Sequence, residues 1–308
     1  MTLSDGEVVV IATLAATAAR GYLLRIDYRQ YPSYPQGYAI HLSLGLIAAF
    51  LGALAPVALF AGELAAASFL ALAATQFREV RKIEREALAN LEETELVRRG
   101  SAYIEGVARV FEARNYVTML AALVVAGLLQ ALRPPTAQGV ALAAGATVVI
   151  VATVGRSSRG LVVGDVARVR PAAIEFQGPL LVVEGTVVYN VARQQAREVF
   201  LREGQALVVE PRDAAAAATL ASPGQRQAVL HDLVARVGVR LDVDEPEFAP
   251  VARRRQDGTG VIFVVIPAVR DLGAMVQAIR SAPVLESSVR LSGRAAGGAI
   301  LPRRLEQP

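Results

Sequence analysis

The sequence contains no cysteine and only two histidines among its 308 residues. Without cysteine, the chain has no disulfide, no thiol nucleophile and no thiolate metal ligand. A zinc site would need carboxylates as ligands, because the two histidines have no usable spacing. The single lysine, Lys82, lies in no glycine-rich loop, which excludes a phosphate-binding P-loop. We therefore expect no cofactor, no metal and no enzymatic activity.

Positive charge is almost absent from the apolar segments of the first half. Lys and Arg total 32, yet Arg20 is the only one of them inside the five apolar stretches, which are Val8–Leu24, Ala39–Val57, Leu59–Phe77, Tyr116–Leu132 and Val140–Val154. Charged residues make up 19% of the chain, below the ~25% of a typical soluble protein. A helix of about 17 residues reaches roughly 26 Å, close to the ~30 Å hydrocarbon core of a bilayer. The pattern predicts five membrane-spanning helices.

The loops between these stretches differ in charge. If each stretch crosses the bilayer once, three segments share one face: residues 25–38, residues 78–114 and everything after Arg156. The only positively charged residue on the opposite face is then Arg133. Cytoplasmic loops are the ones enriched in Lys and Arg. We expect the N-terminus outside and the C-terminal domain in the cytoplasm. Because the positive charges follow this topology instead of forming a patch, we expect no nucleic acid partner.

The segment Ala39–Phe77 allows two interpretations. It makes either two crossings joined by a tight turn near Pro56–Phe60, or one crossing followed by a surface helix. The second would place residues 78–114 outside, against the charge rule, so two crossings are favoured. Glu63 beside the turn either faces the external headgroups or contributes to a pore or relay. Arg20 lies near a predicted cytoplasmic end, from which its side chain could extend to the interface.

The fold class that we predict is an α-helical membrane domain, with about five transmembrane helices, followed by a cytoplasmic domain with a small β subdomain and an α/β subdomain. The membrane domain covers residues 1–155 and includes a cytoplasmic helical segment at 78–114. The cytoplasmic domain covers residues 156–300, and residues 301–308 form a loose tail. Short Val-rich runs from Leu161 onward predict strands. A strand–helix–strand unit is expected at Gly260–Pro267, Asp271–Ser281 and Val284–Leu291.

Four short sequence motifs, here called strings, follow one another along the chain. They are Asp27-Tyr-Arg-Gln-Tyr-Pro32, Tyr103-Ile-Glu-Gly-Val-Ala108, Gly224-Gln-Arg-Gln-Ala228 with His231-Asp232, and Pro283-Val-Leu-Glu-Ser287. Together they resemble the YIEGIA family of membrane proteins from spore-forming bacteria, with Val107 where the family motif has Ile. The resemblance implies an integral membrane protein linked to spore formation, with a small soluble capping partner. It implies no activity. The candidate functional residues are Tyr103, Ile104, Glu105, Gly106, Glu63, Asp27, Arg29, Arg226 and His231.

Two functions are compatible with these features. Spans rich in Ala and Gly allow close helix packing, and a Gly/Ala-rich last span followed by a strand is analogous to mechanosensitive-type channels. The leading expectation is an oligomeric channel or pore that is gated by the cytoplasmic domain and a capping partner. The alternative is a membrane scaffold that anchors a cytoplasmic protein complex at a spore membrane. A membrane enzyme is disfavoured by the residues available for catalysis.

Overall fold

The computed structural model describes residues 2–30, 37–75, 77–92, 98–157, 161–242, 245–246 and 248–289. The chain divides into two compact units. The helical unit comprises Met1–Leu88 and Val107–Arg159, and the C-terminal unit comprises Ala89–Gly106 and Gly160–Pro308. The segment 78–114, which we expected to lie wholly in the membrane domain, is therefore divided between the two units. The expected tail at 301–308 lies outside the described residues.

Among the described residues, four helices are long and apolar enough to cross a membrane. They are α1 (Asp5–Gln30), α2 (Gly37–Phe60), α5 (Ser101–Leu132) and α6 (Thr136–Ser157). Each contains most or all of one predicted apolar stretch. At 1.5 Å per residue, even the 22 residues of α6 exceed the ~30 Å of a hydrocarbon core. The described structure therefore has four candidate spans.

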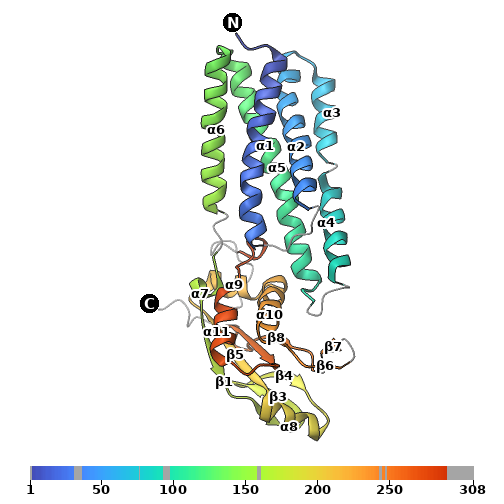
Figure 1. Ribbon diagram of the computed structural model, residues 1–308, viewed down its shortest axis with the longest axis vertical. Coiled ribbons are helices and arrows are strands. Elements are labelled where there is room, and N and C mark those ends of the chain that lie inside the picture. Colours follow the sequence, from blue (N-terminus) through green and yellow to red (C-terminus); the bar gives the residue numbers. More distant parts are fainter. Residues whose placement is uncertain are drawn as a thin grey trace. The chain divides into compact units, whose positions relative to one another are not determined.

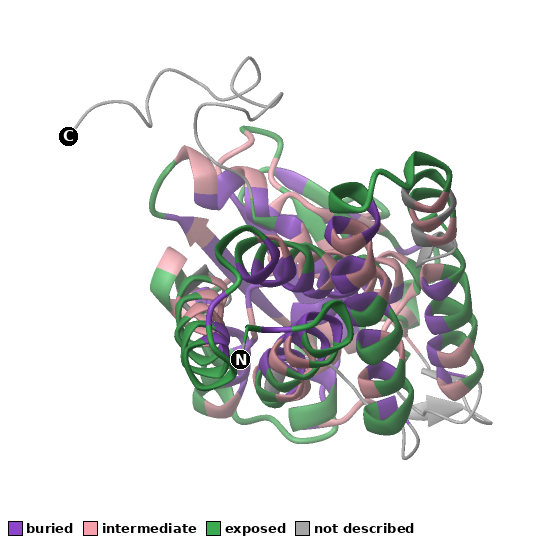
Figure 2. Ribbon diagram, turned by 90° about the horizontal axis from the view of Figure 1, so that it is seen from above, coloured by how far each residue is buried: buried purple, intermediate pink, exposed green. Residues whose placement is uncertain are grey.

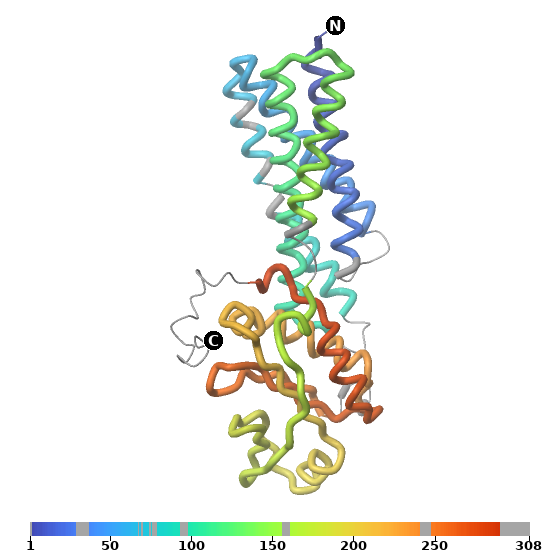
Figure 3. Tube along the Cα trace, turned by 90° about the vertical axis from the view of Figure 1, so that its left-hand side faces the viewer, coloured from blue at the N-terminus to red at the C-terminus, as the bar shows by residue number. Residues whose placement is uncertain are grey.

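The predicted span Leu59–Phe77 has a different structure. Helix α2 continues to Phe60, a turn occupies residues 61–63, and α3 (Leu64–Ala74) then has only 11 residues. At about 16 Å, α3 is too short to cross a hydrocarbon core alone. Helix α4 (Phe77–Glu92) follows it in the same direction, antiparallel to α2 (Figure 1). Two short helices, α3 and α4, therefore take the place of the predicted third span (Figures 1 and 3).

Both the beginning of α1 and the turn between α5 and α6 lie at one end of the helical unit. Thr2 forms an isolated antiparallel bridge with Pro135, and Arg133 Nη1 donates to the Leu3 carbonyl at 3.0 Å. Arg133 Nη2 also lies 2.8 Å from Asp5 Oδ1. Asp5 is in the first turn of α1, where the helix dipole favours a negative charge. Arg133 thus joins the two segments.

Small residues dominate the interior of the bundle. The buried cluster is built largely from alanines of α1, α2 and α5, with valine and leucine between them: Leu3, Val8, Val9, Ala12, Ala16, Ala49, Ala53, Ala121, Ala122, Val125, Ala126, Leu129 and Ala143. A Cβ added to Gly52 would collide with the backbone oxygen of Met119 in α5. Small side chains permit this approach of two helix backbones, which is how helices associate in lipid.

The C-terminal unit is built on an antiparallel sheet with the strand order β1-β5-β9-β8. Its strands are β1 (Ala167–Ala172), β5 (Gln205–Pro211), β8 (Val251–Arg254) and β9 (Val261–Val265). All five residues of β9 are buried, because both faces of the sheet are covered. Leu207 and Phe263 point into one core, and their neighbours Val208 and Ile262 into the other. This alternation is the two-residue period of a strand.

Helices cover one face of this sheet, and a second sheet covers the other. On the first face lie α10 (Pro223–Val237) and α11 (Leu272–Ser281), accompanied by the shorter α7 (Val163–Val166) and α9 (Ala214–Leu220). The second face packs against α8 and the sheet β2-β3-β4, whose elements are β2 (Glu175–Gln177), β3 (Leu180–Val183), β4 (Thr186–Asn190) and α8 (Gln194–Glu203). The remaining elements are β6 (Leu241–Asp242), β7 (Glu245–Pro246) and the 3₁₀ helix η1 (Glu286–Ser288).

Two details of the predicted domain are wrong. The composition of Val284–Leu291 predicts a strand, but η1 lies there, because the Leu285 N–H donates to the Gln225 side chain instead of to a neighbouring strand. The strand expected from Leu161 begins only at Ala167, after the single turn of α7. Strands β1 and β9 both pair with β5, so they belong to one sheet.

Candidate functional site

Three charged residues are buried together in the helical unit. Arg20 and Asp27 lie two turns apart on α1, and Arg114 lies on α5. Their exposed fractions are 0%, 1% and 5%. Arg20 Nη1 donates to Asp27 Oδ2 at 2.8 Å, and Arg114 donates to Asp27 Oδ1 from Nε and Nη2, both at 3.1 Å. The Asp27 carboxylate thus holds two guanidinium groups from two helices.

The packing around Arg20 shows why its side chain does not extend to the interface, although its place in the sequence would allow it. The side chain crosses Gly45 of α2, where an added Cβ would lie 2.7 Å from Arg20 Cγ. Arg20 Nε and Nη2 have no hydrogen-bond partner among the described residues. Removing a charge from water is unfavourable unless it is paired. The buried guanidinium therefore depends on Asp27, and Asp27 is the centre of the cluster.

A second buried pair lies beside this cluster. His41 Nε2 of α2 is 3.3 Å from Glu84 Oε2 of α4, and both side chains are at most 3% exposed. The imidazole stacks on the Phe111 ring, with centroids 3.9 Å apart and planes inclined by 10°. Tyr28, the residue after Asp27, lies 6.1 Å from both rings. The three-residue charge cluster, the His41–Glu84 pair and their aromatic neighbours thus connect α1, α2, α4 and α5.

In a protein that lies in a membrane, such a cluster is a candidate functional site by default. Ionisable residues within spans are energetically unfavourable, and they mark ion pathways, proton relays or sensors. Asp27 is near the end of its candidate span Asp5–Tyr28, and His41 is near the start of Gly37–Phe60. The cluster therefore lies toward the end of the helical unit opposite the N-terminus (Figure 1).

Three of the four family strings meet in the C-terminal unit. Tyr103 N, in the first turn of α5, donates to Gln227 Oε1 at 3.0 Å. A Cβ on Gly106 would lie 2.6 Å from the Ser287 hydroxyl, and one on Gly224 would lie 2.7 Å from the Ala102 carbonyl oxygen. Residues more than 100 positions apart are thus in close contact. At Gly224 the contact is with backbone and leaves no room for a side chain, whereas at Gly106 the Ser287 side chain would have to move.

Gln225 joins the second and third of these strings. Its side chain is fully buried. Nε2 donates to the Pro283 carbonyl at 2.9 Å, and Oε1 accepts from Leu285 N at 2.7 Å. Both ends of the amide are used, which is how a buried polar group avoids a desolvation penalty. These strings form a packed junction.

Asp232, next to His231, has an unusual electrostatic environment. Burial raises the pKa of Asp232 from 3.8 to about 6, and the positive charge of Arg99 opposes this shift. Arg99 is itself bound to Glu92, with Nη1 at 2.9 Å from Oε1. A carboxyl group that titrates near neutral pH is therefore present in the junction, although burial and not a catalytic partner causes the shift.

The other predicted site residues are dispersed. Glu63 is exposed in the turn before α3. Ile104 is 5% exposed, and Glu105 is partly buried. Arg226 lies in the second turn of α10, and His231 is partly buried on the same helix. The side chain of Arg29 lies outside the described residues.

Sequence reasoning missed Arg114, the His41–Glu84 pair and Gln225 as site residues. Arg114 and Asp27 are 87 positions apart, and no local pattern connects them. One signal was available for Arg20. A basic residue inside an apolar stretch requires a counter-charge, and Asp27, seven positions later, is two helical turns away on the same face.

Comparison with known proteins identifies the family. Residues 8–294 match the family described as "YIEGIA protein". The chain belongs to the YIEGIA family. It is also 38% identical over 283 residues to "Uncharacterized protein YphB" of Bacillus subtilis (strain 168), with 92% of this chain and 93% of that protein aligned. No solved structure matches. The YIEGIA match includes both units and all four strings.

Proposed function

We propose that this YIEGIA protein is an integral membrane protein that assembles into an oligomeric channel or pore, gated by its C-terminal unit. In this proposal the N-terminus lies outside and the C-terminal unit in the cytoplasm, which the charge distribution favours. One observation on α6 carries the proposal. Only 11% of its apolar window is buried within the chain, against 39–50% for the other three candidate spans. Helix α6 is drawn mostly as exposed at the left of Figure 2.

The exposed side of α6 carries small and apolar residues. Between residues 140 and 149 the exposed positions are Val140, Ala141, Leu142, Ala144, Gly145, Val148 and Val149. A Cβ on Gly145 would meet nothing within 4 Å, whereas Gly45 and Gly52 are in close contact inside the unit. Small residues favour close helix association, and an apolar lining can gate a pore by dewetting. We assign this side of α6 to contacts between subunits around the pore.

The continuity of α5 supports gating by the C-terminal unit. Residues 101–106 of this helix belong to the C-terminal unit, and its remaining residues belong to the helical unit. The junction holds the first part through Gln227, and the charge cluster holds the second part through Asp27. Helix α5 is therefore shared by the two units, and we propose that gating acts through it. We further propose a role in spore formation with a small soluble capping partner, as the sequence resemblance implies.

Ion flux through liposomes tests the proposal. Gly145→Leu places a larger side chain where the single chain has open space, so we expect a normally folded protein with at least tenfold lower flux. Ala18→Leu, at an exposed position of α1, is the matched control and should conduct normally. The particle size in detergent should exceed that of one chain. A conducting monomer, or equal effects of the two substitutions, would contradict the role of α6.

A membrane scaffold that anchors a cytoplasmic complex is the second candidate. It is favoured by the same apolar surface of α6, which would also be suited to face lipid. A scaffold would give no flux above that of protein-free liposomes at any membrane potential, and Gly145→Leu would then change nothing. That result would replace the channel with the scaffold.

A further inference from the structure

Two polar side chains in the interior of the helical unit have hydrogen-bonding groups that the fold does not use. Arg20 of α1 and Asn115 of α5 are both 0% exposed. Arg20 Nη1 donates to Asp27, whereas Arg20 Nε and Nη2 have no hydrogen-bond partner among the described residues. In the same part of the chain, Nδ2 and Oδ1 of Asn115 also have none. A buried polar group without a partner is unfavourable, so these groups require an explanation.

The packing around Gly45 of α2 brings these two side chains to the same level of the bundle. Arg20 crosses α2 at this glycine, where an added Cβ would lie 2.7 Å from Arg20 Cγ. One turn before Gly45, the His41 ring stacks on Phe111 of α5, with centroids 3.9 Å apart. Helices α2 and α5 run in the same direction (Figure 1). Asn115 comes one turn after Phe111 on the same side of α5, so it lies at the level of Gly45 and on the side that faces α2.

This side of α5 also faces α1. The Tyr28 ring of α1 lies 6.1 Å from the Phe111 ring, measured between centroids. Arg114, the residue before Asn115, donates from Nε to the Asp27 carboxylate of α1 at 3.1 Å. The unused groups of Arg20 and Asn115 therefore lie where α1, α2 and α5 meet.

The positive charge of Arg20 is only partly compensated at this place. Asp27 shares its carboxylate between two guanidinium groups, because it accepts from Arg20 at Oδ2 and from Arg114 at Oδ1. The neighbouring carboxylate of Glu84 lies against His41, at 3.3 Å. A water molecule could accept hydrogen bonds from Arg20 but would not balance its charge, whereas an anion would do both.

We propose that Arg20 and Asn115 bind a small monovalent anion of the halide type where α1, α2 and α5 meet. Nε and Nη2 form one edge of the planar guanidinium, so both can donate to a single acceptor. The Asn115 amide adds a further N–H donor. The close approach of Arg20 to Gly45 favours a small ion over a larger oxyanion. This site does not depend on conduction by the proposed pore.

Equilibrium binding of radioactive chloride to the full chain in neutral detergent tests the proposal, with gluconate replacing chloride to keep the ionic strength constant. The wild type should bind one chloride ion per chain. Arg20→Gln and Asn115→Leu should each lower the affinity about tenfold or more, because each removes donors to the anion. Thr118→Val is the matched control. Thr118 is also buried on α5, but its hydroxyl already donates to the Arg114 carbonyl, so chloride binding should not change.

Asn115→Leu keeps a similar side-chain volume and leaves the ion pairs of Asp27 in place, so it keeps the test valid if Arg20→Gln does not fold. Gly145→Leu, which tests the proposed pore, should leave chloride binding unchanged, and the two proposals can therefore fail separately. If the wild type shows no saturable chloride binding, the anion site is overturned, and ordered water molecules satisfy these groups instead. Equal loss in Asn115→Leu and Thr118→Val, or loss in Gly145→Leu, would likewise overturn it.

Discussion

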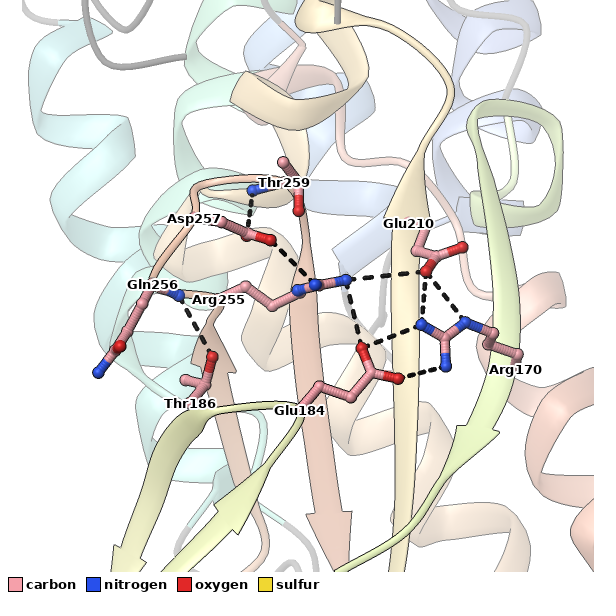
Figure 4. A network of polar contacts seen from close by, with 8 residues as sticks. All are labelled: Arg170, Glu184, Thr186, Glu210, Arg255, Gln256, Asp257 and Thr259. Atoms are coloured by element: carbon pink, nitrogen blue, oxygen red, sulfur yellow. Dashed lines mark hydrogen bonds and ion pairs between the residues drawn. The ribbon is translucent and has the colours of Figure 1, made fainter. Parts of the chain in front are cut away.

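Both the helical unit and the C-terminal unit contain ion pairs between arginine and carboxylate side chains, but these pairs are buried in the helical unit and partly exposed in the C-terminal unit. In the helical unit, Asp27 joins Arg20 and Arg114 where all three side chains are at most 5% exposed. In the C-terminal unit, Glu184 and Glu210 bind Arg170 at a site where the side chains are 28–41% exposed (Figure 4). Partly exposed ion pairs contribute little to stability, whereas loss of one partner from a buried pair is strongly destabilising. The two units should therefore respond very differently to similar substitutions.

The largest effect is expected from Asp27→Asn. This change leaves two buried guanidinium groups without their counter-charge, so the free energy of unfolding should fall by about 3–5 kcal/mol. Unfolding of the full chain in detergent, followed by circular dichroism, measures the change. Glu63→Gln, which removes an exposed acid from the same unit, is the control and should leave stability unchanged. A loss below about 1 kcal/mol for Asp27→Asn would show that water reaches the cluster.

An intermediate effect of opposite sign is expected from Asp232→Asn. The folded pKa of Asp232, about 6, lies above its ordinary value of 3.8. The charged form therefore destabilises the fold, and stability that is present below about pH 4 is lost as the pH rises through about 6. At pH 8 the variant should be more stable than the wild type by up to about 2–3 kcal/mol. The advantage should shrink toward about pH 4, and a difference that does not vary with pH would contradict this origin.

The smallest effect is expected from Glu184→Gln. The substitution removes the charge that binds Arg170 and, at 3.4 Å, Arg255. Because the site is partly exposed and screened, we expect a loss of about 0.5–1 kcal/mol at pH 7. The Arg170 hydrogen bond lowers the pKa of Glu184 below its ordinary 4.5. The wild type should therefore lose this advantage only as the pH falls below about 4.5, and unfolding curves at pH 7 and pH 3 would detect it.

Local sequence patterns predicted the candidate spans of the helical unit more accurately than they predicted the strands of the C-terminal unit. The stretches Val8–Leu24, Ala39–Val57, Tyr116–Leu132 and Val140–Val154 each correspond to a candidate span, because hydropathy is a sum over neighbouring residues. The stretch Leu59–Phe77 does not form one long helix, because a turn at residues 61–63 precedes α3 and α3 ends at Ala74. In the C-terminal unit, Val284–Leu291 has the composition of a strand, but Gln225 takes the N–H group of Leu285.

The amino-acid order by itself determined which segments are apolar, which loops carry the positive charge, and which four strings resemble the family. Those properties follow from composition and local spacing. Only the tertiary structure decided that Asp27 holds Arg114 across 87 positions, that Gln225 joins Pro283 to α10, and that Gly52 is enclosed while Gly145 is open. The reason is physical, because the register of packed helices and strands determines which distant side chains come within about 3 Å of each other, and local patterns do not encode that register.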